Sequence, residues 1–241
     1  MRTLRLLHKW FGLIVGLQLL LWTVSGVVFA WLDHGAVTAE HSVREPEHRG
    51  LPPTTRLLEP ATLLAGLDDA RLPVVELYAI GDTWVYRLQF ADRVELRSAA
   101  DGAPFAIDEL QVRQLAGDRY AGAGALRAVA RHTGPTLDMR EAEPSWEASF
   151  DDPQGTSLYF SGTDGRFLAA RNDTWRLYDF FWMLHTMDYR GRDDFNNPLV
   201  ILVTTGALWL GISGVLLLLQ SFGLTKILDS GPGSRPHARR R

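Results

Sequence analysis

The 241-residue sequence contains no cysteine. This absence excludes thiolate zinc sites, iron–sulfur clusters, haem attached covalently through paired cysteines, and catalysis by a thiol. Motifs of hydrolases and nucleotide-binding proteins are missing too, since the chain has no G-x-S-x-G, no H-E-x-x-H and no glycine-rich phosphate loop. With a net charge of −3, the composition gives no reason to expect a nucleic acid as a partner.

Two long stretches of the sequence lack charged residues altogether. Trp10–Leu32 spans 23 residues and Phe195–Thr225 spans 31, and the most apolar part of the second stretch is Pro198–Leu219. A helix of roughly 20 apolar residues is long enough to cross the ~30 Å hydrocarbon layer of a bilayer. The sequence therefore predicts an integral membrane protein with two transmembrane helices, at residues 10–32 and 197–221.

The first apolar stretch also has to be compared with a cleaved signal peptide. A signal peptide has an apolar core of about 7–15 residues, followed by a cleavage site between small residues. The stretch in this sequence is longer, and it ends in Phe29-Ala30-Trp31-Leu32-Asp33, where bulky side chains suit cleavage poorly. We therefore expect this helix to remain uncleaved.

Basic residues are distributed unevenly along the chain. Segment 33–194 contains 17 arginines, no lysine and 27 acidic residues, a net charge of −10. The two ends have one acid, Asp229, and eight basic residues, which are Arg2, Arg5, Lys9, Lys226, Arg235, Arg239, Arg240 and Arg241. By the positive-inside rule, residues 1–9 and the basic tail 222–241 lie in the cytoplasm and the acidic middle segment lies outside. In a Gram-negative cell, this predicts an inner-membrane protein with a periplasmic domain.

The middle segment is predicted to contain a linker and then an extracytoplasmic α+β domain. Residues 33–57 carry histidine, glutamate, arginine and proline, so we expect them to form the linker, and residues 58–173 to form the domain. Its first unit is predicted to have one helix and three strands before an Asp101-Gly102 turn, at residues 59–70, 74–79, 83–90 and 93–98.

A second unit of the domain repeats this order of elements. It is predicted to have a helix at 107–130, with a break near Gly117 or near Gly122 and Gly124, and strands at 147–150 and 157–161. An Asp164-Gly165 turn then leads to a last strand at 166–171. Because the two Asp-Gly turns lie 63 residues apart, we predict a duplicated module.

The stretch between the domain and the second apolar run is amphipathic and rich in aromatic residues. Residues 174–196 include Trp175 and Trp182 and are expected to lie in the membrane interface. Asn197 followed by Pro198 matches an N-cap and the first position of a helix, which predicts where the second transmembrane helix begins.

Two histidines lie at the predicted membrane boundaries. His8 precedes the first apolar stretch and His185 precedes the second, each among aromatic and aliphatic residues. An ionisable side chain is costly in such a place, so each histidine is expected to have a partner or a function. Neutral imidazole is a common axial ligand of haem iron. The alternative is an interfacial histidine that hydrogen-bonds to lipid headgroups or to backbone.

Short motifs around these histidines resemble a known family. They are His8-Lys9-Trp10-Phe11-Gly12-Leu13, Thr23-x-Ser25-Gly26, Leu184-His185 and Ile212-Ser213-Gly214. Together with the duplicated module, they are similar to the PepSY-associated transmembrane proteins, and the resemblance spans nearly the whole chain. Some relatives are inner-membrane ferric-siderophore reductases that hold b-type haem on histidines and pass electrons outward. The resemblance implies two PepSY-like helix-plus-antiparallel-strand units, haem b, and His8 and His185 as axial ligands.

The two histidines are not expected to bind one iron, because roughly 30 Å of membrane separates their predicted levels. The outer His185 then needs either His34, at the end of the first helix, or His185 of a second subunit as its partner. His8 needs a histidine from another chain. The reductases typically have four membrane helices, whereas this sequence predicts two. We therefore expect a homodimer or a partner membrane subunit.

Two arginines follow His185 closely in the sequence. Arg190 and Arg192 are candidates for pairing with haem propionates or another anionic ligand. The alternative is an interfacial loop whose charges keep the end of the helix in water.

The sequence is compatible with functions of two different classes. The first is a haem-binding electron-transfer subunit linked to iron acquisition, whose reductant is a flavoprotein partner or the quinone pool because the sequence has no nucleotide site. The second is a non-catalytic, membrane-anchored PepSY module that binds or regulates a periplasmic partner, or that assembles a membrane complex.

Overall fold

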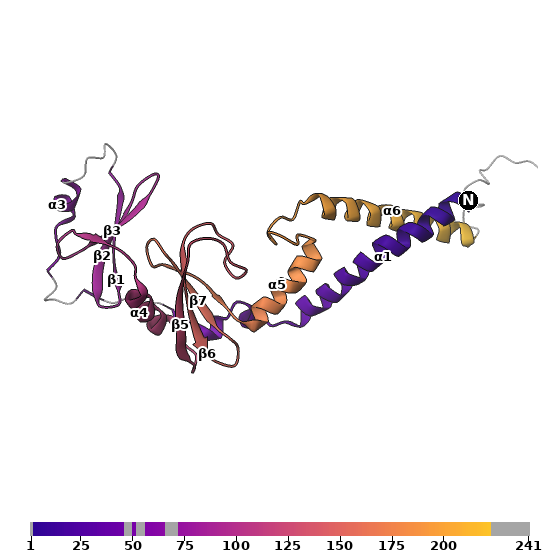
Figure 1. Ribbon diagram of the computed structural model, residues 1–241. Coiled ribbons are helices and arrows are strands. Elements are labelled where there is room, and N and C mark those ends of the chain that lie inside the picture. Colours follow the sequence, from indigo (N-terminus) through magenta and orange to yellow (C-terminus); the bar gives the residue numbers. More distant parts are fainter. Residues whose placement is uncertain (1, 46–49, 52–55, 66–71, 223–241) are drawn as a thin grey trace, which may run out of the picture. The chain divides into compact units, whose positions relative to one another are not determined.

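The computed structural model describes residues 2–45, 50–51, 56–65 and 72–222, and the chain divides into two compact units (Figure 1). One unit consists of Met1–Trp31 with Asp179–Arg241, and the other of Leu32–Tyr178. Some predictions lie outside the described residues: the basic tail beyond Phe222, the end of the helix at 59–70, and two short parts of the linker.

Two long apolar helices dominate the first unit, α1 (Arg2–Trp31) and α6 (Pro198–Ser221). Their apolar windows are long enough to cross a membrane, and other protein atoms bury only 17% and 6% of these windows. The core helix of a soluble domain would be mostly buried, so this exposure supports the two predicted membrane helices. Helix α1 begins before the expected Trp10, so it includes His8, and Asn197 caps α6 by accepting the Val200 N–H at 3.0 Å.

Helices α1 and α6 pack side by side (Figure 1). The rings of Phe11 and Trp209 lie 5.0 Å apart between their centroids. A Cβ added to Gly12 would lie 3.7 Å from Leu210, and one added to Gly206 would lie 3.3 Å from Val15. These glycines therefore let the two helices approach closely, as small residues commonly do in membranes.

The second unit contains two four-stranded antiparallel sheets, each preceded by a helix. The first group is α3 (Pro60–Ala65), β1 (Val74–Ile80), β2 (Thr83–Gln89), β3 (Val94–Ser98) and β4 (Pro104–Phe105). The second group is α4 (Glu109–Arg119), β5 (Ala125–His132), β6 (Ser145–Asp151), β7 (Ser157–Ser161) and β8 (Phe167–Arg171). The strands of each sheet are adjacent in sequence order, so the structure confirms an α+β domain with two similar units.

The two Asp-Gly turns occupy equivalent places in the two sheets. Gly102 has a φ of +76° and Gly165 a φ of +72°, a backbone region that side chains disfavour. Each glycine donates its N–H to the last residue of the preceding strand, Gly102 to Ser98 at 2.8 Å and Gly165 to Ser161 at 2.9 Å. A Cβ on Gly102 would contact Leu63 of α3, and one on Gly165 would contact Leu115 of α4. In each half of the domain, the turn thus packs on the helix that precedes that half's sheet.

The prediction of one broken helix at 107–130 is wrong in its second half. Helix α4 ends at Arg119, Tyr120 is extended, and β5 follows. Gly122 permits this change of direction, because a Cβ there would lie 2.3 Å from the Tyr120 hydroxyl. The alanine-rich β5 has the composition of a helix, but its pairing with β6 outweighs this local preference.

The predicted linker is partly structured. It contains α2 (His34–Val37), capped by Asp33, and the 3₁₀ helix η1 (Glu40–Ser42). Val43 then forms an antiparallel bridge with Tyr120, and Ala121 donates its N–H to Ser42 at 2.9 Å. The start of the linker is therefore anchored next to the end of α4.

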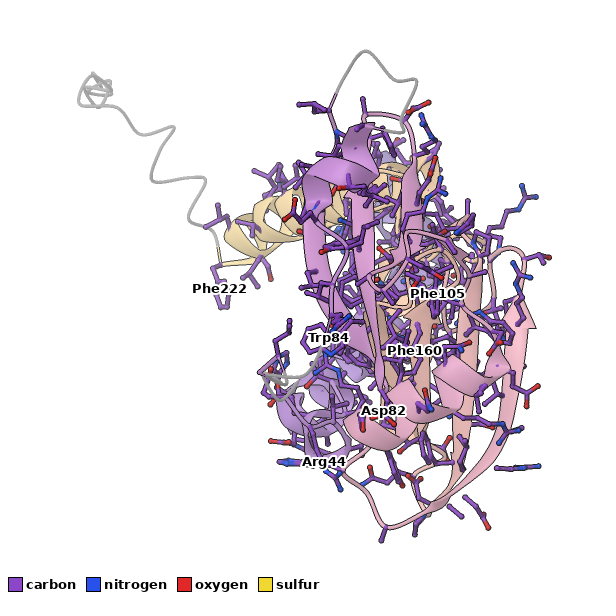
Figure 2. All side chains as sticks on the ribbon, turned by 90° about the vertical axis from the view of Figure 1, so that its left-hand side faces the viewer. Arg44, Asp82, Trp84, Phe105, Phe160 and Phe222 are labelled. Atoms are coloured by element: carbon purple, nitrogen blue, oxygen red, sulfur yellow. The ribbon has the colours of Figure 1, made fainter. Side chains whose placement is uncertain are left out.

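Strand β2 is buried on both faces because it lies between two apolar clusters. Val85 belongs to the larger cluster, which also contains α4 residues and the inner face of the second sheet. Tyr86 and Leu88 point to the opposite side, into a smaller cluster with Leu63 of α3. Phe160 is part of the larger cluster and Phe105 packs against it (Figure 2).

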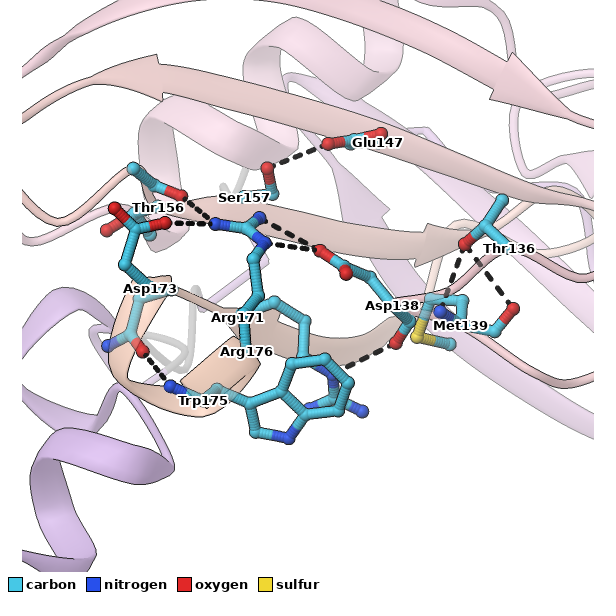
Figure 3. A network of polar contacts seen from close by, with 12 residues as sticks. Thr136, Asp138, Met139, Glu147, Thr156, Ser157, Arg171, Asp173, Trp175 and Arg176 are labelled. Carbon is cyan, nitrogen blue, oxygen red and sulfur yellow. Dashed lines mark hydrogen bonds and ion pairs between the residues drawn. The ribbon is translucent and has the colours of Figure 1, made fainter. Parts of the chain in front are cut away.

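A polar network lies where α5 (Asp173–Thr186) begins (Figure 3). The Arg176 guanidinium donates to Asp138 at 2.8 Å and to Asp173 at 2.9 Å. The guanidinium of Arg171 lies over the ring of Trp175, 4.2 Å from its centroid. Because Asp138 lies in the loop between β5 and β6, these contacts attach that loop to the start of α5.

Candidate functional site

The apolar helices of the first unit contain buried polar side chains. Ser25 and Gln18 on α1 and Ser213 on α6 are nearly inaccessible, with 0%, 8% and 3% of their surface exposed. A polar group buried in apolar surroundings is destabilising unless it is hydrogen-bonded. All three side chains have partners, and two of these partners are the histidines predicted from the sequence.

His8 is bound to the other membrane helix. Its Nδ1 lies 2.7 Å from the hydroxyl oxygen of Ser213, and that hydroxyl lies 3.0 Å from the carbonyl oxygen of Leu210 in the preceding turn of α6. A Cβ on Gly214 would lie 3.3 Å from His8 Cε1 and 3.9 Å from its Nε2. The glycine after the serine therefore leaves room for the imidazole.

His185 forms the same contact with α1. Its Nδ1 lies 2.7 Å from the hydroxyl oxygen of Ser25, and that hydroxyl lies 3.0 Å from the carbonyl oxygen of Trp22. The end of α5 is fixed by two further bonds from α1. The Trp22 indole N–H donates to the His185 carbonyl at 2.7 Å, and the Gln18 amide donates to the Leu184 carbonyl at 3.2 Å.

The imidazole of His185 lies next to aromatic rings. Its centroid is 5.6 Å from that of Phe29, in an edge-on arrangement, and 6.1 Å from that of Trp22. Within the described part of the chain, Nε2 of His185 makes no hydrogen bond, and the same holds for Nε2 of His8. Both imidazoles thus contact a serine through Nδ1 and not through Nε2.

The two histidine–serine pairs lie at opposite ends of the membrane helices. His8 and Ser25 are 17 residues apart on α1, which corresponds to about 25 Å along a helix. Each histidine is held by the serine of another apolar segment, so the structure does not bring His8 and His185 together. His34 is the exposed first residue of α2 in the second unit.

The two predicted arginines have different surroundings. Arg192 donates to the carboxylate of Asp179, which is only 5% exposed, and so its guanidinium is already paired. The side chain of Arg190 is exposed to solvent, and its backbone N–H donates to Asp188.

The loop that contains these arginines is organised by Asp188. Its carboxylate accepts four backbone N–H groups, those of Arg190, Gly191, Asp193 and Asp194. Burial acts to raise the pKa of Asp188, but these hydrogen bonds outweigh it and hold the pKa below its ordinary value. The loop is therefore an ordered turn rather than only a set of solvated charges.

The sequence predicted the histidines but not the residues that hold them. The repeated Ser-Gly pairs, Ser25-Gly26 and Ser213-Gly214, were the visible signal, but in the sequence they contributed only to the family resemblance. Gln18 and Trp22 were likewise hidden in an apolar run. Within the residues that the structure describes, no group of three histidine, aspartate or glutamate side chains is placed to hold a metal ion. Haem iron, by contrast, needs only axial imidazoles from the protein.

Comparison with protein families identifies a family that covers nearly the whole chain. The family model described as "PepSY-associated TM region" matches residues 2–240. No curated protein and no solved structure matches the chain.

Proposed function

The chain belongs to the family of PepSY-associated transmembrane proteins, and from this premise we propose that it is a haem-binding electron-transfer subunit of the inner membrane. His8 and His185 are the proposed axial ligands, one near each end of the membrane helices. The two-sheet domain meets the electron acceptor or a partner, and a ferric siderophore is the acceptor that the family resemblance suggests.

One observation carries this proposal. Each boundary histidine has its Nδ1 at 2.7 Å from a buried serine hydroxyl, and its Nε2 makes no hydrogen bond in the described part of the chain. Histidines that bind metals usually engage their second ring nitrogen with a hydrogen-bonding partner, which fixes the ring.

The residues present fit an axial role for a b-type haem. The rings of Phe29 and Trp22 give His185 apolar surroundings, and Gly214 keeps the edge of the His8 ring free of a side chain. The bound haem would supply one-electron chemistry between ferric and ferrous iron. The chain would hold the imidazoles in place and surround them with apolar groups.

The proposal includes a second copy of the chain or a partner membrane subunit. About 25 Å of helix separates His8 from Ser25, the residue that holds His185. His8 and His185 of one chain therefore cannot bind the same iron. The second imidazole for His185 is His34 or His185 of another copy, and that for His8 comes from another chain. A flavoprotein or the quinone pool is the proposed electron donor.

Charge supports an orientation with both ends in the cytoplasm. Segment 33–194 has a net charge of −10, whereas the two ends are basic. A periplasm-dependent reporter fused after Gly155 is expected to be active, and the same reporter fused after Arg241 is expected to be inactive. Activity of the second fusion would contradict this orientation.

The haem proposal is tested by absorption spectroscopy. The full chain, purified in mild detergent from haem-sufficient cells, is expected to give b-type bands in the reduced-minus-oxidised spectrum. His185→Ala is expected to retain only the haem held by His8, and His8→Ala only the haem held by His185. The double variant should retain no haem. His41→Ala is the control, because this exposed histidine lies in η1. A folded but colourless wild-type protein would refute haem binding.

A second candidate function is a non-catalytic module that binds or restrains a periplasmic partner. Strand β5 favours it, because this eight-residue strand is an edge of its sheet and pairs only with β6 among the described residues. An edge strand offers unpaired backbone groups to an extended segment of another protein. A colourless protein would leave this candidate as the better one.

A further inference from the structure

We infer that Ser25 and Ser213 are positioning residues that place the proton of each boundary imidazole on Nδ1 and leave the Nε2 lone pair for a ligand. The identity of that ligand as haem rests on the proposed function, whereas the position of the proton does not. The inference follows from the number of protons available at each pair.

A serine hydroxyl has a single proton to donate, although its oxygen accepts more than one hydrogen bond. Ser25 Oγ lies 3.0 Å from the Trp22 carbonyl oxygen and 2.7 Å from His185 Nδ1. A carbonyl oxygen only accepts, so the hydrogen bond between Ser25 and Trp22 uses the hydroxyl proton. The remaining contact is then satisfied only if His185 carries a proton on Nδ1 and donates it to Ser25.

The same count holds at the other end of the helices. Ser213 Oγ lies 3.0 Å from the Leu210 carbonyl oxygen and 2.7 Å from His8 Nδ1. Both serines donate to the carbonyl oxygen three residues earlier, as serine side chains in helices often do. Two segments far apart in the sequence therefore reach the same arrangement at the same distances.

Because both serines are buried, their hydroxyls cannot hydrogen-bond to water instead of to the protein. Ser25 is 0% exposed and Ser213 is 3% exposed, so their hydroxyls have only the carbonyl and the imidazole as partners. In apolar surroundings, a pair of facing lone pairs is not relieved by solvent. A proton on Nδ1 thus satisfies the carbonyl, the hydroxyl and Nδ1 at each pair.

The glycine after Ser213 leaves room for the histidine beside it. At Gly214, a Cβ would lie 3.3 Å from Cε1 and 3.9 Å from Nε2 of His8. At Gly26, a Cβ would meet nothing within 4 Å, so this glycine does not lie against His185. Ser213-Gly214 thus combines a proton acceptor for Nδ1 with room for the ring, whereas at Ser25-Gly26 only the serine contacts the histidine.

A purely structural role for the serines makes a different prediction. If they only joined helices, their removal would lower stability without changing which ring nitrogen carries the proton. The distinguishing quantity is therefore the tautomer of each imidazole, and it is measured on the protein without haem. A failure of the haem proposal consequently leaves this test intact.

The test uses the full chain in detergent, prepared without haem and labelled with ¹⁵N in its histidines. Long-range ¹H–¹⁵N spectra are expected to show that Nδ1 of His8 and of His185 carries a proton and that Nε2 does not. Ser25→Ala should change the signals of His185 alone, and Ser213→Ala those of His8 alone. Ser25→Thr and Ser213→Thr should restore the wild-type tautomers, because threonine makes the same backbone contact.

A second pair of variants does not touch the serines. Gly214→Val is expected to displace the His8 ring and alter its signals, because the added side chain meets the imidazole. Gly211→Val is the matched control on the same helix, since a Cβ there meets nothing within 4 Å. A wild-type protein with the proton on Nε2, or alanine variants with unchanged tautomers, would overturn the inference.

If haem is bound, the serines should also affect its retention. Loss of an outer partner of a metal-bound histidine lowers metal affinity about 10- to 100-fold. Ser25→Ala and Ser213→Ala are each expected to weaken haem binding by this factor, with rescue by threonine. Correct tautomers in a protein that never binds haem would refute the proposed function and leave the role of the serines standing.

Discussion

Replacement of Arg87 by methionine is expected to lower the free energy of unfolding of the two-sheet unit by about 3–5 kcal/mol. Arg87 donates to Asp164 at 2.8 Å and to Glu76 at 2.9 Å, and Arg87 and Asp164 are only 3% and 1% exposed. Arg87 lies on β2 of the first sheet and Asp164 in the last turn of the second, so the ion pair joins the repeats. The variant would remove the buried counter-charge of Asp164 and leave its carboxylate paired only with Arg166, whose side chain is largely exposed. Denaturant unfolding of the full chain, followed by tryptophan fluorescence, measures the loss.

Arg113→Met is the matched control for this prediction. Arg113 pairs with Glu109 on the surface of α4, and both side chains are about half exposed. An exposed pair of this kind contributes about 0.5 kcal/mol or less. Equal losses for the Arg87 and Arg113 variants would show that the buried pair does not join the sheets.

The contribution of the Arg87–Asp164 pair should also depend on pH. Burial acts to raise the pKa of Asp164, but hydrogen bonds from Ser161 and Arg87 outweigh it, so the pKa lies below its ordinary value. A carboxyl group with a lowered pKa stabilises the fold above the pKa of its unfolded state, about 3.9, and this stabilisation is lost as the pH falls through the folded value. The stability gap between wild type and Arg87→Met should therefore begin to narrow below about pH 5 and keep narrowing as the pH falls past 3.9 toward the lower pKa of the folded state. A constant gap would contradict an ionic origin.

Local patterns in the sequence were enough to predict much of the fold. Long apolar runs predict membrane helices because the bilayer leaves few alternatives, and Asp-Gly pairs predict turns because glycine tolerates a positive φ. The equivalent turns at Gly102 and Gly165 confirm the duplication that their spacing indicated. In each of these cases, the deciding interaction lies within a few residues along the chain.

The wrong prediction at 107–130 has a non-local cause. Arg119 and Tyr120 end α4, and the following alanine-rich residues become β5 because β6 is available for pairing along seven positions. Composition alone favours a helix there. A partner strand that begins at Ser145 cannot be recognised from the residues of β5 themselves.

The same limit explains what was missed at the candidate site. The position of His8 and His185 at the edges of apolar runs was a local signal, and it sufficed to single them out. Ser213, which holds His8, lies 205 residues from it in the sequence, and Ser25, which holds His185, lies 160 residues from it. Sequence alone showed two similar Ser-Gly pairs, but only the tertiary structure assigns each serine to the histidine of another segment.

The structure also separates two arginines that the sequence treated alike. Arg192 is paired with Asp179, whose side chain is 7% exposed, whereas Arg190 is exposed. Arg192→Met is therefore expected to destabilise the membrane unit by about 3 kcal/mol, because a buried carboxylate loses its guanidinium. Arg190→Met, two residues earlier, is expected to change the unfolding free energy by less than about 0.5 kcal/mol.

Thermal unfolding in detergent, recorded together with haem content, distinguishes a structural from a ligand-binding arginine. A guanidinium that holds α5 to its following loop affects stability first, and haem is lost only as far as the fold is lost. A guanidinium that binds a propionate affects haem retention at unchanged stability. We expect the first behaviour for Arg192, since its charge is already balanced by Asp179. A drop in haem content without a drop in stability in Arg192→Met would instead make that arginine part of the binding site and its contact with Asp179 secondary.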